Sequence, residues 1–196
     1  MRRATAQDVP TVVDILVSAF YEDPTWAWAF PDPDLRAEQH RRVWTLFVEG
    51  AVRYPWVWLA DNDTAAAVWL PPDSTDMSEE QEAALEPLVI ELVGADAPRV
   101  METFEVFERA HPRDEPHFFL SLLGTRAEHR GRGLGLALLA DNLREIDRLG
   151  IPAYLEASNP ANVALYERYG FAVRSSFTLP GGPEVATMWR DARPVV

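Results

Sequence analysis

The chain has 196 residues, no cysteine and a net charge of −13, with 31 acidic side chains against 18 basic ones. This length suffices for one domain with a substantial hydrophobic core. The acidic balance argues against general nucleic-acid binding, which needs a basic surface. The lack of cysteine excludes disulfides, thiolate metal ligands and cysteine nucleophiles. A negative charge is compatible with a cationic small-molecule partner, although it serves solubility equally well.

No apolar run approaches the roughly 20 residues that a membrane-spanning helix needs. The residues that follow Met1 form an amphipathic pattern instead of the apolar core of a signal peptide. We therefore expect a cytoplasmic protein without a membrane, nucleic-acid or metal partner, and we expect it to be a monomer or a homodimer.

The first part of the chain mixes helical and strand-like patterns. Thr5 and Asp8 have the spacing of a capping box, and Asp34 stands where a second helix would begin. The patterns predict, in order, a strand over residues 2–4, a helix ending near 23, an aromatic loop over 26–31, a helix ending before 54, and a hairpin of strands 56–60 and 65–70. The aromatic loop suits the wall of an apolar pocket, although its tryptophans can equally pack a helix against a sheet.

The rest of the chain predicts a mixed sheet. The patterns give helices over 78–93 and 97–110, a strand over 117–125, a helix over 134–149, a strand over 153–158, a helix capped by Asn159, and a hairpin of strands 171–179 and 184–190. The strand-helix-strand order favours one parallel pair, and the hairpins add antiparallel pairs. We expect one α+β or α/β domain over residues 1–196, with residues 73–112 as a helical insertion.

A glycine-rich turn, residues 125–137, connects the predicted central strand to the helix after it. Glycine lets a ligand approach the main chain, and the free amides at a helix N-terminus bind phosphate. Arg126, Arg130 and Arg132 add positive charge around this turn. The turn therefore predicts an anion-binding site.

Three kinds of phosphate-binding turn compete for this stretch. A dinucleotide fingerprint would need a glycine at Leu136 or Leu138, and the repeated strand-helix array of that fold is absent, even though Glu156 stands where its ribose-binding acid would be. A P-loop would need Gly-Lys-Ser/Thr, which does not occur. The third pattern, Arg/Gln-x-x-Gly-x-Gly/Ala, is matched by Arg130, Gly133 and Gly135.

With two further segments, this third pattern resembles the GNAT superfamily of acyl-CoA-dependent N-acyltransferases. The strand before the turn ends in Leu123-Gly124-Thr125, and the segment from Asn159 to Phe171 is similar to the family's Asn-x-x-Ala-x-x-Leu-Tyr-x-x-x-Gly-Phe. The motif-bearing resemblance covers residues 117–190. Segment 111–116 and the strand at 154–158 also resemble the puromycin N-acetyltransferase-like members of that superfamily.

The resemblance implies a GNAT-like mixed sheet with a splayed parallel strand pair, and acetyl-CoA as the cosubstrate. It assigns the binding of acetyl-CoA to Leu123, Gly124, Thr125, Arg130, Gly131, Arg132, Gly133, Leu134, Gly135, Leu136, Asn159 and Asn162. It implies that Tyr166 is the acid that protonates the departing thiolate, for which the ordinary tyrosine pKa near 10 is suitable.

The general base is less closely defined by the sequence. Glu156 can accept the amine proton or bind a cationic acceptor, but it can also be a structural carboxylate. His117 is a second candidate, although a histidine at a strand end is more often simply exposed, and His129 is expected to be solvated. Tyr166 without its motif would be interpreted as a core residue.

We therefore expect an acetyl-CoA-dependent N-acetyltransferase that acts on a primary amine of a small molecule by direct attack in a ternary complex. An amine-bearing antibiotic or metabolite is the expected acceptor, which would make antibiotic resistance one role. The alternatives are a protein N-terminal or lysine acetyltransferase and a non-catalytic acyl-CoA-binding module.

Overall fold

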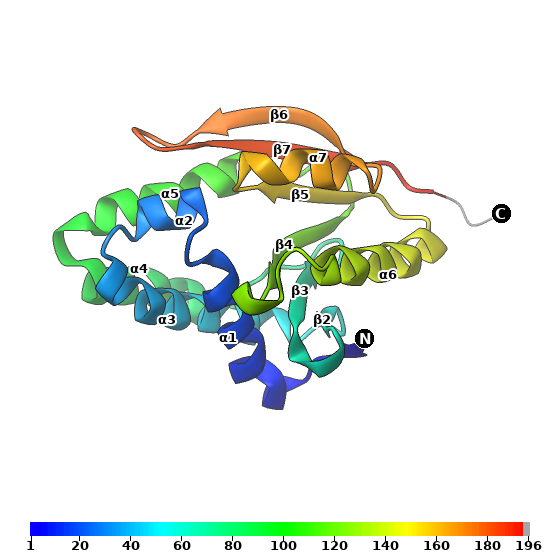
Figure 1. The fold of residues 1–196 in the computed structure, drawn as a ribbon. Helices are drawn as coiled ribbons and strands as arrows, with labels where there is room; N and C mark the ends of the chain where they lie inside the picture. The colour runs from blue at the N-terminus through cyan, green and yellow to red at the C-terminus, as the bar shows by residue number, and fades with distance from the viewer. Residues whose placement is uncertain (194–196) are drawn as a thin grey trace.

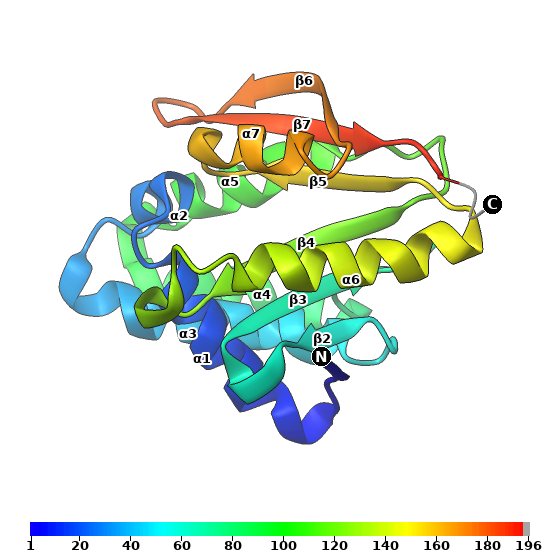
Figure 2. The same ribbon diagram turned by 45° about the vertical axis from the view of Figure 1, so that its right-hand side comes forward.

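The computed structural model describes residues 1–193, which form one mixed sheet of seven strands with helices on both faces (Figures 1 and 2). The strand order is β1-β2-β3-β4-β5-β7-β6. The strands are β1 (Arg2–Arg3), β2 (Val57–Leu59), β3 (Ala65–Leu70), β4 (Phe118–Thr125), β5 (Ala153–Ala157), β6 (Ala172–Thr178) and β7 (Glu184–Arg190). Only the pair of β4 and β5 is parallel, so the predicted mixed sheet is confirmed.

Seven α-helices in the described part of the chain cover the sheet. They are α1 (Val9–Phe20), α2 (Pro24–Ala29), α3 (Pro33–Ala51), α4 (Glu79–Val93), α5 (Ala97–Ala110), α6 (Leu134–Leu149) and α7 (Val163–Glu167). Figure 2 shows α6 lying along β3 and β4, while α1 and α3 pack on the opposite face. Among residues 1–193, no helix has both the length and the hydrophobicity to cross a membrane.

Strand β3 separates the two halves of the core. Because successive side chains of a strand point to opposite faces, Val68 packs in the cluster around α1 and α3 while Ala67 and Trp69 pack in the cluster beneath α6. All six residues of β3 are buried. A strand that is apolar on both faces therefore occupies the middle of the molecule, next to β4.

The parallel strands β4 and β5 separate along their length. They pair only over three positions, from Phe118 opposite Ala153 to Leu120 opposite Leu155. Beyond Leu120, β4 continues with β3, after a bulge at Ser121, and β5 continues with β7. The facing edges of β4 and β5 consequently lack a strand partner toward their C-terminal ends. This splay places unpaired main chain at the centre of the sheet.

Most of the predicted elements are confirmed, and three details are wrong. Residues 24–29 form a short helix rather than a loop, because Asp23 accepts hydrogen bonds from the amides of Thr25 and Trp26 and Pro24 occupies the first turn. The cap of α3 is Asp32, not Asp34. The helix after Asn159 is shorter than expected: Pro160–Asn162 form a 3₁₀ turn, and α7 ends at Glu167.

Candidate active site

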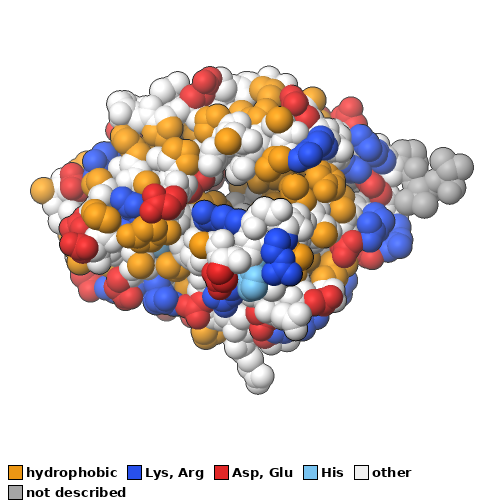
Figure 3. All heavy atoms as spheres, in the orientation of Figure 1, with side chains coloured by type: hydrophobic (Ala, Val, Ile, Leu, Met, Phe, Trp, Pro, Cys, Tyr) orange, Lys and Arg blue, Asp and Glu red, His pale blue; other side chains and the backbone are white. Residues whose placement is uncertain are grey.

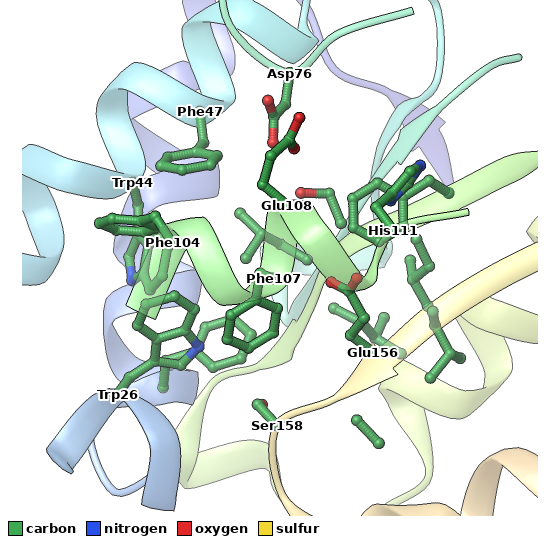
Figure 4. Close-up of a pocket in the computed structure, with 18 of the residues that line it drawn as sticks. Trp26, Trp44, Phe47, Asp76, Phe104, Phe107, Glu108, His111, Glu156 and Ser158 are labelled. Atoms are coloured by element: carbon green, nitrogen blue, oxygen red, sulfur yellow. The ribbon is translucent and has the colours of Figure 1, made fainter. Parts of the chain in front are cut away.

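A cavity of about 420 Å³ opens where β4 and β5 separate. Its walls come from the two strands and from α1, α2, α3, α4, α5 and α7, with part of the segment between β3 and α4. Figure 4 shows side chains from these elements converging on one space. Segments far apart in the sequence thus meet at the splay, as in most ligand-binding pockets.

Aromatic side chains from α2, α3 and α5 form one wall of the cavity. Trp26 stacks on Phe107 with ring centroids 5.8 Å apart and an interplanar angle of 15°, and it meets Trp44 edge-on at 4.7 Å. Phe47 and Phe104 continue this wall, with ring centroids 5.7 Å apart. Trp26 and Trp44 are both buried, so the aromatic residues pack between elements and line the cavity at the same time.

Glu156 projects from β5 into this cavity (Figure 4). The hydroxyl group of Tyr154 donates a hydrogen bond of 2.9 Å to one of its carboxyl oxygens. Burial raises the pKa of Glu156 to about 8, and the nearby carboxylates of Asp76 and Glu108 act in the same direction. A carboxyl group with this pKa gains and loses a proton near neutral pH, which suits a general base.

Tyr166 lies on α7 and lines the same cavity as Glu156. Among the described residues, none accepts a hydrogen bond from its hydroxyl group. Burial raises the pKa of Tyr166 to about 12, and the carboxylate of Asp23 adds to the effect. This pKa is higher than the ordinary tyrosine value assumed from the sequence, so the phenol stays protonated at neutral pH and is a weaker acid than that assignment assumed.

A hydrogen-bond network at the end of β5 was not predicted from the sequence. Ser158 donates a hydrogen bond of 2.8 Å to the carboxylate of Asp23, and its carbonyl oxygen accepts one of 2.9 Å from the hydroxyl group of Thr25. Burial raises the pKa of Asp23, which also caps α2. The network ties the C-terminal end of β5 to α2. Its only sequence signal is the cap at Asp23-Pro24, which does not reveal a partner more than a hundred residues away.

The N-terminus of α6 has the geometry of an anion site. Gly131 and Gly133 have left-handed backbones, with φ of 75° and 74°, and a Cβ atom on either would meet nothing within 4 Å. The first hydrogen bond of the helix runs from the amide of Ala137 to the carbonyl of Gly133. The amides of residues 134–136 therefore have no acceptor within the helix and lie at the positive end of its dipole.

Three arginines surround this N-terminus. Arg130 donates to the carbonyl oxygens of Ser18 and Ala19 at the end of α1, and Arg126 donates to that of Asp63. Neither these two nor Arg132 forms an ion pair with a carboxylate of residues 1–193. Figure 3 shows basic side chains, all arginine because the chain has no lysine, beside a hollow in this face. Their positive charge therefore remains available to an anion.

Two other glycines of the motif allow close packing. A Cβ atom on Gly135 would come within 2.5 Å of the hydroxyl oxygen of Thr125, and one on Gly124 within 2.7 Å of Ala19. Because neither glycine has a Cβ atom, α6 and α1 can pack closely against the end of β4. The preceding residue, Leu123, lines the cavity, so β4 runs from the cavity to the anion site.

The two asparagines assigned from the motif have different surroundings. The side-chain oxygen of Asn159 accepts a hydrogen bond of 3.0 Å from the amide of Ala161 and so caps the turn before α7. Asn162 lines the cavity together with Tyr166. Both lie on the α7 side of the splay.

The two histidines considered from the sequence, His117 and His129, have different surroundings. His117 is buried, not exposed, and its Nδ1 lies 2.6 Å from the carbonyl oxygen of Glu115. It lines a second cavity of about 310 Å³, whereas Glu156 and Tyr166 line the first. Burial lowers the pKa of His117 and lowers that of the neighbouring His111 to about 4. His129 is half-buried and lies 3.2 Å from the guanidinium of Arg132.

This combination of splayed strands, glycine turn and helix N-terminus has a counterpart among known proteins. The model of the acetyltransferase (GNAT) family matches residues 13–171. The chain belongs to the GNAT family. Among curated proteins, this GNAT chain is 24% identical over 190 residues to an uncharacterized N-acetyltransferase of Schizosaccharomyces pombe, which covers 91% of the chain and 76% of that protein.

Other known proteins either match a shorter part of the sequence or are similar in fold over nearly the whole chain. The GNAT chain is 41% identical over 58 residues to mycothiol acetyltransferase of Streptomyces coelicolor, and this match spans 28% of the chain and 19% of that relative. A solved Corynebacterium glutamicum protein described as histone acetyltransferase HPA2 and related acetyltransferase has a TM-score of 0.70 and 26% identity, covering 99% of this chain and 97% of its own. The polyamine N-acetyltransferase of Drosophila melanogaster, at 18% identity and a TM-score of 0.67 over 97% and 98% of the two chains, shares the fold.

Proposed function

We propose that this protein transfers the acetyl group of acetyl-CoA to a primary amine of a small molecule. The observation that carries the proposal is that Glu156 and Tyr166 line one cavity, from which β4 leads directly to the anion site at α6. A group that can take a proton and a group that can give one therefore lie at the end of a site for a phosphate-bearing molecule.

The residues of the α6 N-terminus suit the pyrophosphate of acetyl-CoA. The free amides of residues 134–136, the open backbone at Gly131 and Gly133, and Arg130 and Arg132 would hold the phosphates. The unpaired edge of β4 at residues 123–125, together with Asn159 and Asn162, would hold the pantetheine arm. Bound in this way, acetyl-CoA supplies an activated thioester near the cavity.

A group of this chain can then assist each step of the acetyl transfer. Glu156 takes the proton from the ammonium group of the acceptor, directly or through a water molecule, so that the nitrogen can attack. A backbone amide of β4 near Leu123 donates a hydrogen bond to the carbonyl oxygen as negative charge develops on it. Tyr166 gives its proton to the departing sulfur, and its pKa of about 12 keeps the phenol protonated at neutral pH until that transfer.

The dimensions and lining of the cavity favour a small acceptor. Its volume of about 420 Å³ lies within the usual range for small-molecule sites, roughly 300–1,000 Å³. Its aromatic wall suits an apolar body, and its carboxyl groups suit a cationic amine. An amine-bearing antibiotic or metabolite fits this description.

The test is the release of free thiol from acetyl-CoA with a panel of primary amines, comparing wild type with Tyr166→Phe. Tyr166→Phe should lower kcat by about a hundredfold or more, as expected when a general acid is removed. The matched control is Tyr169→Phe, which lies on the same segment but outside the cavity. It should keep nearly wild-type activity.

Tight binding of acetyl-CoA without turnover of any amine would instead support a non-catalytic acyl-CoA-binding module. Equal losses of kcat in Tyr166→Phe and Tyr169→Phe would show that Tyr166 is not the general acid and that this segment has only a packing role.

A further inference from the structure

The charge inside the cavity is entirely negative. Five carboxyl side chains line it, and no arginine or lysine of the described residues does. They are Asp76, Glu82, Glu105, Glu108 and Glu156. Glu105 and Glu108 have arginine partners, so one ammonium group at Glu156 would still leave Asp76 and Glu82 without a basic partner among the described residues.

Asp76 and Glu82 are the two carboxyl groups of this lining without an ion pair or a hydrogen bond from another side chain among residues 1–193, and Asp76 is the more buried of the two. Glu105 and Glu108 form ion pairs with Arg109 and Arg113, and Glu156 accepts the hydrogen bond from Tyr154. No other side chain of residues 1–193 donates a hydrogen bond to Asp76. Burial raises the pKa of Asp76 to about 6, and Glu108 and Glu82 act in the same direction. A half-buried carboxyl group that faces a cavity without a partner attracts a cation.

Asp76 also lies at a junction between two cavities. The first cavity and the second one, of about 310 Å³, share Asp76, Glu82 and Glu108 as well as His111 and Phe119. Tyr166 and Glu156 line only the first cavity. In Figure 4 the carboxyl groups of Asp76 and Glu108 point toward each other, while Glu156 enters separately from β5. The two acidic positions are therefore distinct sites within one continuous space.

We propose that the acceptor carries two cationic nitrogens, one that reacts at Glu156 and a second that stays protonated and binds at Asp76, with Glu82 and Glu108 beside it. This proposal rests on the proposed acetyl transfer and names its substrate class: a diamine or polyamine with an apolar spacer. The spacer would lie along the aromatic wall near Phe107, whose ring faces the cavity (Figure 4).

The test compares α,ω-diamines, from diaminopropane to diaminoheptane, with n-alkylamines of the same chain length. For wild type, kcat/KM for the best diamine should exceed that for its matched monoamine by about tenfold, the usual scale of a hydrogen bond to a charged group. Asp76→Asn should remove this preference, measured within each variant as the ratio of kcat/KM for the diamine to kcat/KM for the monoamine, so that the effect of Asp76 on the pKa of Glu156 cancels. Glu82→Gln should weaken the preference for diamines. Because Glu82 is exposed, this substitution should not impair folding.

Glu102→Gln is the matched control, because Glu102 is an exposed residue of α5 outside both cavities. It removes the same charge and should leave the preference for diamines intact. Equal kcat/KM for diamines and monoamines in wild type, or an equal loss for both amines in Asp76→Asn, would overturn the proposal.

Calorimetry of the same amines with CoA-loaded protein separates this proposal from the acetyl transfer itself. If no amine is acetylated, the proposed activity fails, yet tighter binding of diamines that is lost in Asp76→Asn would still support the second cation site. If acetylation occurs without any such difference in binding or rate, the acetyl transfer stands and the second cation site is wrong.

Discussion

At the scale of single residues, Tyr154 controls the state of the candidate base. Its ring is buried between those of His111, His117 and Trp189, and its hydroxyl group donates to Glu156 at 2.9 Å. Burial and the neighbouring Glu156 raise the pKa of Tyr154, so the hydroxyl group remains a donor throughout the working range of pH. A hydrogen bond to a carboxylate stabilises its charged form.

This contact leads to a prediction about pH dependence. Glu156, with a pKa raised to about 8, acts as a base only when it has lost its proton, so kcat/KM should rise as pH increases through about 8. Tyr154→Phe removes the stabilising donor, and the rise should move to higher pH by about one unit, while the plateau at high pH is retained. Tyr21→Phe, which removes a hydroxyl hydrogen bond to Pro33 outside the cavity, should leave the profile unchanged. A fall in the plateau without a shift would show that Tyr154 acts only in packing.

The sequence predicted only part of the candidate site at this scale. Glu156 and Tyr166 stood out because each lies in or beside a motif with a fixed order of residues. Asp76 did not, because it lies in a segment without hydrophobic periodicity between β3 and α4. Its environment depends on contacts with α3 and α5, and local sequence does not specify which distant elements will enclose a residue.

At the scale of elements, the N-terminus of α6 permits a controlled test of the anion site. Gly133 and Gly150 flank the same helix, both have left-handed backbones, and a Cβ atom on either would meet nothing within 4 Å. Gly133→Glu and Gly150→Glu therefore carry a similar conformational cost, about 1–2 kcal/mol. Only the first change puts a carboxylate where the phosphates would bind.

Gly133→Glu should weaken the binding of acetyl-CoA by at least about tenfold, because a like charge faces the phosphates and the helix dipole is opposed. Gly150→Glu should lower the melting temperature by a similar amount but leave that affinity unchanged. Isothermal calorimetry on both variants checks this. Unchanged affinity in Gly133→Glu would rule out the α6 N-terminus as the pyrophosphate site.

The elements differ in how well local sequence specified them. The predicted helix over 134–149 has the bounds of α6, because glycines mark both of its ends. Helix α2 was not predicted, because the segment is short and aromatic and was interpreted as a loop. The cap at Asp23 and the proline in the first turn are sufficient to start a helix there. The closing hairpin was predicted, but not the insertion of β7 between β5 and β6, since strand order is set by tertiary packing rather than by local pattern.

At the scale of the whole molecule, the acidic cavity and the basic N-terminus of α6 occupy separate places. The chain carries a net charge of −13, its cavity is lined by five carboxyl groups, and the arginines around α6 lack carboxylate partners within the described chain. An anionic cosubstrate would thus be attracted to the N-terminus of α6 and a cationic acceptor to the cavity. Acetyl-CoA would contact both strands of the splayed pair along the facing edges that do not pair with each other beyond Leu120.

A ligand that binds only the folded protein raises its stability by mass action. CoA at about 100 times its Kd should stabilise the fold by about 2.7 kcal/mol. For a domain of this size that corresponds to a rise in Tm of roughly 5–10 °C. Differential scanning calorimetry should show this rise with CoA, a smaller one with ADP, which lacks the pantetheine arm, and almost none with NADP. Stabilisation by NADP but not by CoA would restore the dinucleotide interpretation of the glycine turn, and the absence of the CoA shift in Gly133→Glu would locate the effect at α6.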